Sequence, residues 1–235
     1  MPEALARFFL ADRQPLVVAG THGKTTTSAM AAKVWSDCGR DPGFLIGGVP
    51  IDLGVSFRCG SGPRFVIEGD EYNAAYFDRG AKFLHYRPET LILTSVEHDH
   101  ADLYPTPESL LAAYSRLIAL VPESGLIVAC GDSAEIRQLA EAARAPVVFY
   151  GEHATNAVRL LGVPEADSAG VRFRLREESG DELAVTMPVW GVHNVVNALA
   201  VWAAGRRGGI EAGELAGALA RFRGVQRRQE LLADH

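Results

Sequence analysis

A glycine-rich segment that begins at Gly20 has the residue types of a phosphate-binding loop. The segment reads GTHGKTTT and ends at Thr27. Glycines allow backbone N–H groups to turn toward phosphate oxygens, and the start of a helix adds partial positive charge. Lys24 would supply a full charge for the β- and γ-phosphates, and the Thr25 hydroxyl could coordinate Mg²⁺. Because the segment lies between an apolar strand and a helix start, a phosphate loop is favoured over a glycine turn beside a surface lysine.

The glycine spacing departs from that of the most common phosphate loops. The usual pattern, GxxxxGK[ST], would require a glycine at position 18, where Val18 stands. The first glycine is instead Gly20, which shortens the loop to GxxGKT. The spacing therefore argues against the ordinary P-loop GTPases.

Three carboxylates follow the apolar run 65–67 in the string EGDE, which begins at Glu68. At the carboxyl end of a parallel strand they would lie where open α/β sheets bind ligands. Mg²⁺ bound between a nucleotide and a protein takes one or two carboxylates and several waters. Glu68 is the predicted metal ligand because it is nearest the strand, whereas Asp70 and Glu71 also suit the first turn of a helix.

A second group of ionisable residues follows the apolar run 91–94. The string SVEHDHAD begins at Ser95 and includes His98 and His100. Zinc is one metal ion that these side chains could bind. Carboxylates dominate the group and no cysteine lies near it, so Mg²⁺ or Mn²⁺ fits better. Since imidazole is an unusual ligand for Mg²⁺, the composition alone leaves a metal site here open.

Amide and imidazole side chains form a further candidate group in the string GVHNVVNALA, which begins at Gly191. On a helix that starts there, Asn194 and Asn197 lie three positions apart beside an apolar stripe, where an amide could pair with the edge of an adenine. Asn194 would suit a helix cap equally well. Further along, Arg227 and Arg228 form a basic pair near the end of the chain, and such a pair is usually exposed to solvent.

The elements that must position these residues alternate between short apolar strands and helices. Apolar runs occupy 16–19, 65–67, 91–94, 126–129 and 147–150. Helices are predicted over 24–38, 106–121, 134–143, 193–206 and 212–222. Residues 171–176 and 183–187 flank a turn and predict an antiparallel hairpin. Continuous apolar strands separated by helices predict an α/β fold, with a mostly parallel sheet flanked by helices on both faces.

Composition sets limits on the partners. The 235 residues carry a net charge of −6, so the chain offers no overall attraction for nucleic acid or an anionic membrane. The three cysteines are widely spaced, which suits reduced thiols in the cytoplasm. The N-terminus lacks the pattern of a signal peptide, and the longest apolar run, 198–204, is too short to span a bilayer. A cytoplasmic protein without nucleic-acid or membrane partners is expected.

The motifs, taken in order, resemble those of one family. The strings GTHGKTTT, EGDEY, EHDHAD, HNVVN and GVQRR, which run from Gly20 to Arg228, are similar to the motifs of the Mur ligases. These enzymes are ATP-dependent, amide-forming ligases of peptidoglycan synthesis. The resemblance covers essentially the whole chain. It implies a P-loop NTPase-like α/β fold and ATP and Mg²⁺ as cofactors, with Mn²⁺ as a possible substitute.

The resemblance also implies a role for each matched position around the phosphates. The loop residues that would hold the phosphates are Gly20, Thr21, His22, Gly23, Lys24, Thr25 and Thr26. Thr25 and Glu68 would bind the first Mg²⁺, and His100 would contact a second. The resemblance therefore makes Lys24, Glu68 and His100 the candidate catalytic residues.

The C-terminal motifs would bind the rest of the nucleotide. By the same resemblance, Asn194 would contact adenine, with His193 and Asn197 in support. Arg228 would reach the nucleotide phosphates.

Within the family, the loop containing His22 is similar to that of the ligases that act on UDP-N-acetylmuramate itself. Residues 70–88 most resemble the murein peptide ligase branch, which joins the tripeptide L-alanyl-γ-D-glutamyl-meso-diaminopimelate to UDP-N-acetylmuramate through an acyl phosphate. The branch that adds L-alanine is the alternative, whereas folylpolyglutamate synthetases match these two segments poorly. From a different class, a nucleotide switch or partner-binding module without ligase chemistry is also a candidate.

Mur ligases have three domains, and residues 1–235 are expected to be the central ATP-binding domain. The N-terminal domain for the UDP-sugar and the C-terminal domain for the amino substrate would then be absent. Such a domain is expected to bind nucleotide weakly with Mg²⁺ and not to ligate alone.

Overall fold

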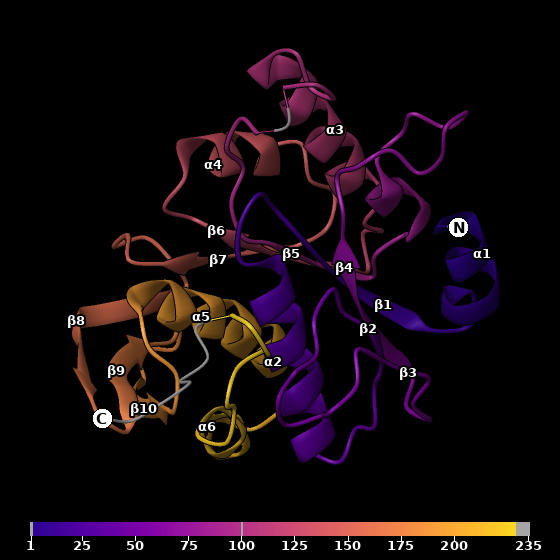
Figure 1. Ribbon diagram of the computed structural model, residues 1–235. Coiled ribbons are helices and arrows are strands. Elements are labelled where there is room, and N and C mark those ends of the chain that lie inside the picture. The colour runs from indigo at the N-terminus through magenta and orange to yellow at the C-terminus, as the bar shows by residue number, and fades with distance from the viewer. Residues whose placement is uncertain (1, 100, 229–235) are drawn as a thin grey trace.

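The computed structural model describes residues 2–99 and 101–228, whose strands form one ten-stranded sheet (Figure 1). The strand order is β10-β9-β8-β7-β6-β5-β1-β4-β2-β3. The mutually parallel strands are β1 (Gln14–Ala19), β2 (Gly43–Leu45), β4 (Arg64–Gly69), β5 (Thr90–Leu93), β6 (Leu126–Cys130), β7 (Val147–Gly151) and β8 (Val158–Asp167). The antiparallel strands are β3 (Phe57–Arg58), β9 (Gly170–Arg176) and β10 (Glu182–Met187).

The position of β1 brings the predicted motifs together. β1 lies between β4 and β5, and Ala19 at its end is in register with Gly69 of β4 and Leu93 of β5. The three strands therefore end at the same level of the sheet. The segments that follow them, beginning at residues 20, 70 and 94, must emerge side by side, at the edge where parallel sheets bind ligands.

Helices cover both faces of the sheet (Figure 1). One face carries α2 (Lys24–Asp37), α5 (Val192–Arg207) and α6 (Ala212–Leu219), which contact one another. The other carries α3 (Pro107–Ala119) and α4 (Ala134–Ala140). Shorter helical segments are α1 (Pro2–Leu5), the π-helical η1 (Ala6–Leu10) and the 3₁₀ segment η2 (Lys82–His85). Among the described residues, no helix has the length and apolar character needed to cross a membrane.

The predicted α/β fold is confirmed, including the parallel strands and the antiparallel hairpin, which is β9–β10. Four helices end earlier than predicted: α2 at Asp37 rather than 38, α3 at Ala119 rather than 121, α4 at Ala140 rather than 143, and α6 at Leu219 rather than 222. Beyond these ends the backbone tightens into i→i−3 hydrogen bonds, such as Phe222 N–H to Leu219 O at 3.1 Å. The apolar pattern continues through these tight turns, which is why periodicity alone overestimates the length of these helices.

Three strands were not predicted: β2, β3 and β8. β2 and β3 are three and two residues long, too short to show a period. β8 contains Gly162 and Pro164, and its pairing with β9 shifts register between Leu161 and Glu165. Glycine and proline weaken the strand pattern, and a bulge accommodates them in the sheet.

The burial of β5 yields a test of the fold. Ile92→Ala is expected to lower the free energy of unfolding by about 2–5 kcal/mol, because it leaves a cavity in the core. Ile92 is 0% exposed, whereas Val163, the matched aliphatic control, is 88% exposed. Val163→Ala should change the free energy by less than about 0.5 kcal/mol. Urea unfolding followed by circular dichroism compares the two variants, and equal losses would contradict the core position of Ile92.

Candidate functional site

Two glycines shape the loop between β1 and α2. Gly20 has φ +139° and Gly23 has φ +80°, in the region that residues with a Cβ rarely adopt. A Cβ on Gly20 would lie 2.1 Å from Thr94 Oγ1, and one on Gly23 would lie 2.8 Å from Asn197 Oδ1. Both positions therefore require glycine, for conformation and for space.

Hydrogen bonds attach this loop to the segment after β5. The Thr94 hydroxyl donates to the His22 carbonyl at 2.6 Å, and Ser95 Oγ accepts the His22 N–H at 2.9 Å. The Thr21 N–H donates to the Ser95 carbonyl at 2.9 Å. Thr94 and Ser95 were not among the predicted site residues. Their position at the carboxyl end of an apolar strand was the available signal, and the pairing of β1 with β5 is what places them against the loop.

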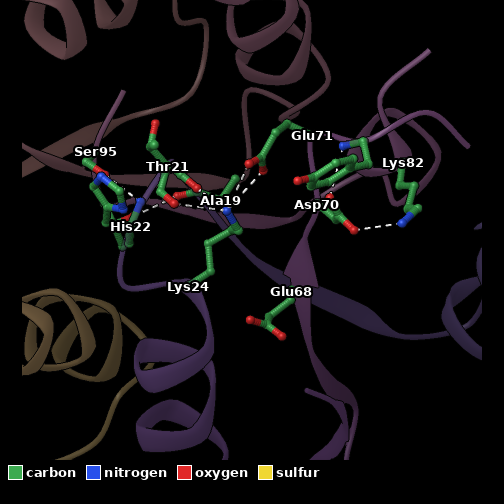
Figure 2. A network of polar contacts seen from close by, with 12 residues as sticks. Ala19, Thr21, His22, Lys24, Glu68, Asp70, Glu71, Lys82 and Ser95 are labelled. Atoms are coloured by element: carbon green, nitrogen blue, oxygen red, sulfur yellow. Dashed lines mark hydrogen bonds and ion pairs between the residues drawn. The ribbon is translucent and has the colours of Figure 1, made fainter. Parts of the chain in front are cut away.

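Lys24 lies folded over the loop (Figure 2). Its Nζ donates to the carbonyls of Gly20 at 2.6 Å and Thr21 at 3.3 Å. It also forms an ion pair with Glu71, 3.0 Å from Oε2. Glu71 is only 3% exposed. Lys24 therefore sits at the predicted phosphate position with a buried carboxylate beside it.

Thr25 and Glu68 lie together, as a shared metal ligand set requires. The Thr25 hydroxyl donates to Glu68 Oε1 at 2.5 Å, and the other carboxylate oxygen accepts the N–H of Gly47. A Cβ on Gly47 would lie 2.4 Å from Glu68 Oε2. Gly47 follows β2, a strand that was not predicted, so its contact with Glu68 could not be anticipated. Hydroxyl and carboxylate oxygens are ligands that Mg²⁺ accepts, so these residues fit that ion.

Asp70 and Glu71 do not begin a helix, so the alternative reading of them as helix-start acids is wrong. They lie in an irregular segment after β4, and the next helical turn, η2, starts only at Lys82. Lys82 Nζ donates to Asp70 Oδ2 at 2.7 Å (Figure 2). The two acids thus face two different lysines. Lys82 reaches Asp70 because the chain reverses between residues 74 and 80, where the Ala74 N–H donates to the Gly80 carbonyl.

These side chains line one pocket of about 590 Å³. It is bounded by Thr21 and Lys24 of the loop, by Gly47, and by the acidic side chains Glu68, Asp70, Glu71 and Asp99. Carboxylates outnumber lysines here, which favours uptake of a divalent cation together with an anionic ligand.

The motif after β5 is described only in part. His100, the predicted second metal ligand, lies outside the described residues. His98 Nε2 is 2.9 Å from the Tyr104 carbonyl, and Glu97 pairs with His22 at 3.7 Å on the exposed side of the loop. Within the described residues, no group of three or more His, Cys, Asp or Glu side chains could hold a metal. The zinc alternative therefore gains no support from the part of the motif that is described.

A second pocket, of about 540 Å³, lies on the other side of the loop. The residues predicted to bind nucleotide that line it are His22, Gly23, Thr26, His193, Asn194, Asn197 and Arg228. α5 begins at Val192 with Gly191 as its N-cap and no side-chain cap. Asn194 instead donates to the Trp190 carbonyl at 2.7 Å, so the helix-cap alternative for Asn194 is wrong.

The segment after α6 closes this pocket. Val225 pairs with Pro50, and the Gln226 N–H donates to the Val49 carbonyl at 3.0 Å. A Cβ on Gly48 would lie 2.7 Å from Val225 and 3.1 Å from Thr25, so the segment packs directly beside the phosphate loop. This packing brings Arg228 to the pocket from a position over 200 residues later in the sequence than the loop.

The chain is similar to one protein family over most of its length. The model of the Mur ligase middle domain matches residues 18–205. The chain is 38% identical over 231 residues to the Escherichia coli UDP-N-acetylmuramate–L-alanyl-γ-D-glutamyl-meso-2,6-diaminoheptandioate ligase, covering 98% of this chain and 50% of that protein. It is 40% identical over 232 residues to the UDP-N-acetylmuramate–L-alanine ligase of Renibacterium salmoninarum, covering 97% of this chain and 47% of that protein.

A solved structure shows the same fold. The Neisseria meningitidis UDP-N-acetylmuramate:L-alanyl-γ-D-glutamyl-meso-diaminopimelate ligase superimposes with a TM-score of 0.87 at 37% identity, covering 96% of this chain and 71% of that chain. The chain spans about half the length of the curated relatives it matches. Because the family model covers most of this sequence and the relatives cover nearly all of it, the chain belongs to the Mur ligase family and contains its middle domain.

Proposed function

We propose that this chain is the nucleotide-binding part of an ATP-dependent ligase that forms an amide bond on the carboxylate of UDP-N-acetylmuramate. The observation that carries the proposal is the position of the phosphate loop between two pockets. Thr26 and Gly23 face the pocket that contains Asn194, and Lys24 faces the pocket that contains Glu68. A nucleotide with its base near Asn194 and its phosphates along the loop would direct its terminal phosphate toward Glu68.

The proposed roles follow this path. Asn194 would contact adenine, with His193 and Asn197 beside it, and Arg228 would reach the phosphates from the closing segment. Backbone N–H groups of residues 20–26 and the N-terminus of α2 would hold the phosphates.

Lys24 would neutralise charge that develops during transfer. Thr25 and Glu68 would hold Mg²⁺, which, when bound, offsets charge between the phosphate and the carboxylate. His100 is proposed, from its motif, to contact a second Mg²⁺.

The proposed reaction has two steps. The lactyl carboxylate of UDP-N-acetylmuramate attacks the γ-phosphorus of ATP, which gives an acyl phosphate and ADP. The amino group of the second substrate then attacks the acyl carbon, phosphate leaves with the C–O bonding electrons, and the amine loses a proton. The tripeptide L-alanyl-γ-D-glutamyl-meso-diaminopimelate is the proposed amino substrate, supported by the names of the E. coli and Neisseria relatives. The Renibacterium relative makes L-alanine the second candidate.

The UDP-sugar and the amino substrate are proposed to be held largely by further domains of a longer protein. The coverage of about half of each relative supports this division. A place in cell-wall peptide recycling and a cytoplasmic location, where ATP is available, belong to the same proposal.

The phosphate loop can be tested by removing its charge. Lys24→Met is expected to weaken binding of Mg²⁺-ATP roughly tenfold to a hundredfold, the range for losing a hydrogen bond to a charged group. Arg172→Met is the matched control, because it removes an exposed cation from β9, outside both pockets. Isothermal titration calorimetry measures both dissociation constants, and equal affinities for the two variants would refute the loop assignment.

The contact between Gly47 and Glu68 can be tested through the metal. Gly47→Ala is expected to displace the Glu68 carboxylate and to reduce the gain in ATP affinity that Mg²⁺ provides, by about tenfold. Titrations of ATP with Mg²⁺ and with EDTA measure that gain. Gly213→Ala is the control, because nothing lies within 4 Å of a Cβ there. An unchanged Mg²⁺ effect in Gly47→Ala would contradict the role of Glu68.

The amino substrate can be identified by phosphate release from ATP in the full-length parent protein. With UDP-N-acetylmuramate present, release is expected with the tripeptide and not with L-alanine. Release with L-alanine alone would assign the chain to the other branch. If neither substrate gave release although ATP bound, the nucleotide-switch alternative would be favoured.

A further inference from the structure

Glu71 has no part in the proposed chemistry, yet it is the carboxylate nearest the lysine of the phosphate loop. Its Oε2 and Oε1 lie 3.0 and 3.2 Å from Lys24 Nζ (Figure 2). Glu71 is 3% exposed, and the side chain of Lys24 is 18% exposed. Water screens such a pair weakly, so Glu71 competes strongly for the charge of Lys24.

The backbone of Glu71 is held in place by its neighbours. The Tyr104 hydroxyl donates to the Glu71 carbonyl at 2.7 Å. Burial, followed by the charges of Glu71 and Asp70, raises the pKa of Tyr104, so the hydroxyl keeps the proton that it donates. On the preceding residue, Asp70 Oδ1 accepts the N–H of Tyr72 at 2.9 Å. These contacts position the backbone of Glu71 beside Lys24.

The donors of Lys24 are all engaged in this state. An ammonium group has three N–H donors, and Lys24 directs them to the Gly20 carbonyl, the Thr21 carbonyl and Glu71. A phosphate oxygen can bond to Lys24 only by replacing one of these acceptors. The two carbonyls belong to the loop backbone, which Thr94 and Ser95 hold in place. Of these three acceptors, Glu71 is the one that belongs to a side chain, and its carboxylate is negatively charged, as a phosphate is.

We propose that Glu71 occupies the phosphate position on Lys24 in the unliganded chain, and that nucleotide binding exchanges Glu71 for a β- or γ-phosphate oxygen. The inference rests on the proposed nucleotide function and adds to it a residue that sets nucleotide affinity. Glu71 supports the loop lysine when no nucleotide is bound and lowers the affinity for any ligand that must take its place. The exchange also turns the Glu71 carboxylate toward the pocket that it shares with Glu68.

The exchange predicts that removing the charge of Glu71 strengthens binding. Glu71→Gln keeps the shape of the side chain, and it is expected to raise the affinity for ATP by about fivefold to tenfold. The affinity for AMP, which lacks the phosphates that Lys24 reaches, should change less than about twofold. Glu71→Asp withdraws the carboxylate by one methylene and should give a smaller gain in the same direction, which provides a second variant if Glu71→Gln does not fold.

A double-mutant cycle distinguishes the exchange of Glu71 for phosphate on Lys24 from general repulsion between Glu71 and the nucleotide. Titration calorimetry would measure ATP and AMP binding to the wild-type chain, Glu71→Gln, Lys24→Met and the double variant. The gain from Glu71→Gln should vanish in the Lys24→Met background. Asp78→Asn is the matched control: it removes a carboxylate that pairs with His85 and lines neither pocket, and it should change ATP affinity less than about twofold.

The other possible results of these titrations would contradict the proposed exchange of Glu71 for phosphate. A gain that persists without Lys24, or that appears equally in Asp78→Asn, would show general repulsion between acidic residues and the nucleotide. Weaker ATP binding by Glu71→Gln would show that Glu71 orients Lys24 for phosphate instead. Failure of the proposed function itself looks different: ATP would then bind no more weakly to Lys24→Met than to the wild-type chain.

Discussion

The alignment of three strand ends is the constraint on which the rest of the site depends. Because β1 pairs with both β4 and β5, the residues after Ala19, Gly69 and Leu93 leave the sheet at one level. The phosphate loop has no regular pairing of its own, and it adopts backbone conformations that glycine reaches readily and other residues do not. Hydrogen bonds from the segment after β5 hold its carbonyl and N–H groups. A loop fixed in this way presents donors to a phosphate without first having to become ordered.

Local charge, rather than net charge, governs what the site can bind. The chain carries a net charge of −6, and the pocket beyond the loop contains more acids than lysines. The acids are nevertheless kept apart by their partners. Glu68 is held by Thr25 and Gly47, Asp70 by Lys82, and Glu71 by Lys24. Each carboxylate can therefore act separately in a small volume, which like charges would otherwise oppose.

The two pockets are built from different parts of the chain. The acid-lined pocket is built from residues 2–99, which include the segments that follow β1, β2 and β4. The pocket around Asn194 requires α5 and the closing segment, which reach the loop from the C-terminal half of the chain. Asn197 lies so close to Gly23 that the helix and the loop fix each other, which links the pocket for the base to the geometry of the phosphates.

The α/β class, the central parallel strands and the main residues of the phosphate loop can be predicted from the sequence alone. Each of these features has a signal within one short stretch of sequence. For the phosphate loop the signal is an apolar run followed by glycines, Lys24 and Thr25, and for the metal ligand it is an apolar run followed by Glu68. The same local reasoning failed for Asp70 and Glu71, whose acidic spacing suits a helix start that the chain does not form.

The contacts between residues far apart in the sequence depend on the tertiary fold. Gly47 meets Glu68 across β2 and β4, Thr94 meets His22 across β1 and β5, and Val225 meets Pro50 at the end of the chain. None of these pairs follows a period in the sequence, since each depends on which strands become neighbours. Strand order is set by burial of the whole core and by the crossover helices, so the partners of the loop follow from the packing of the complete domain.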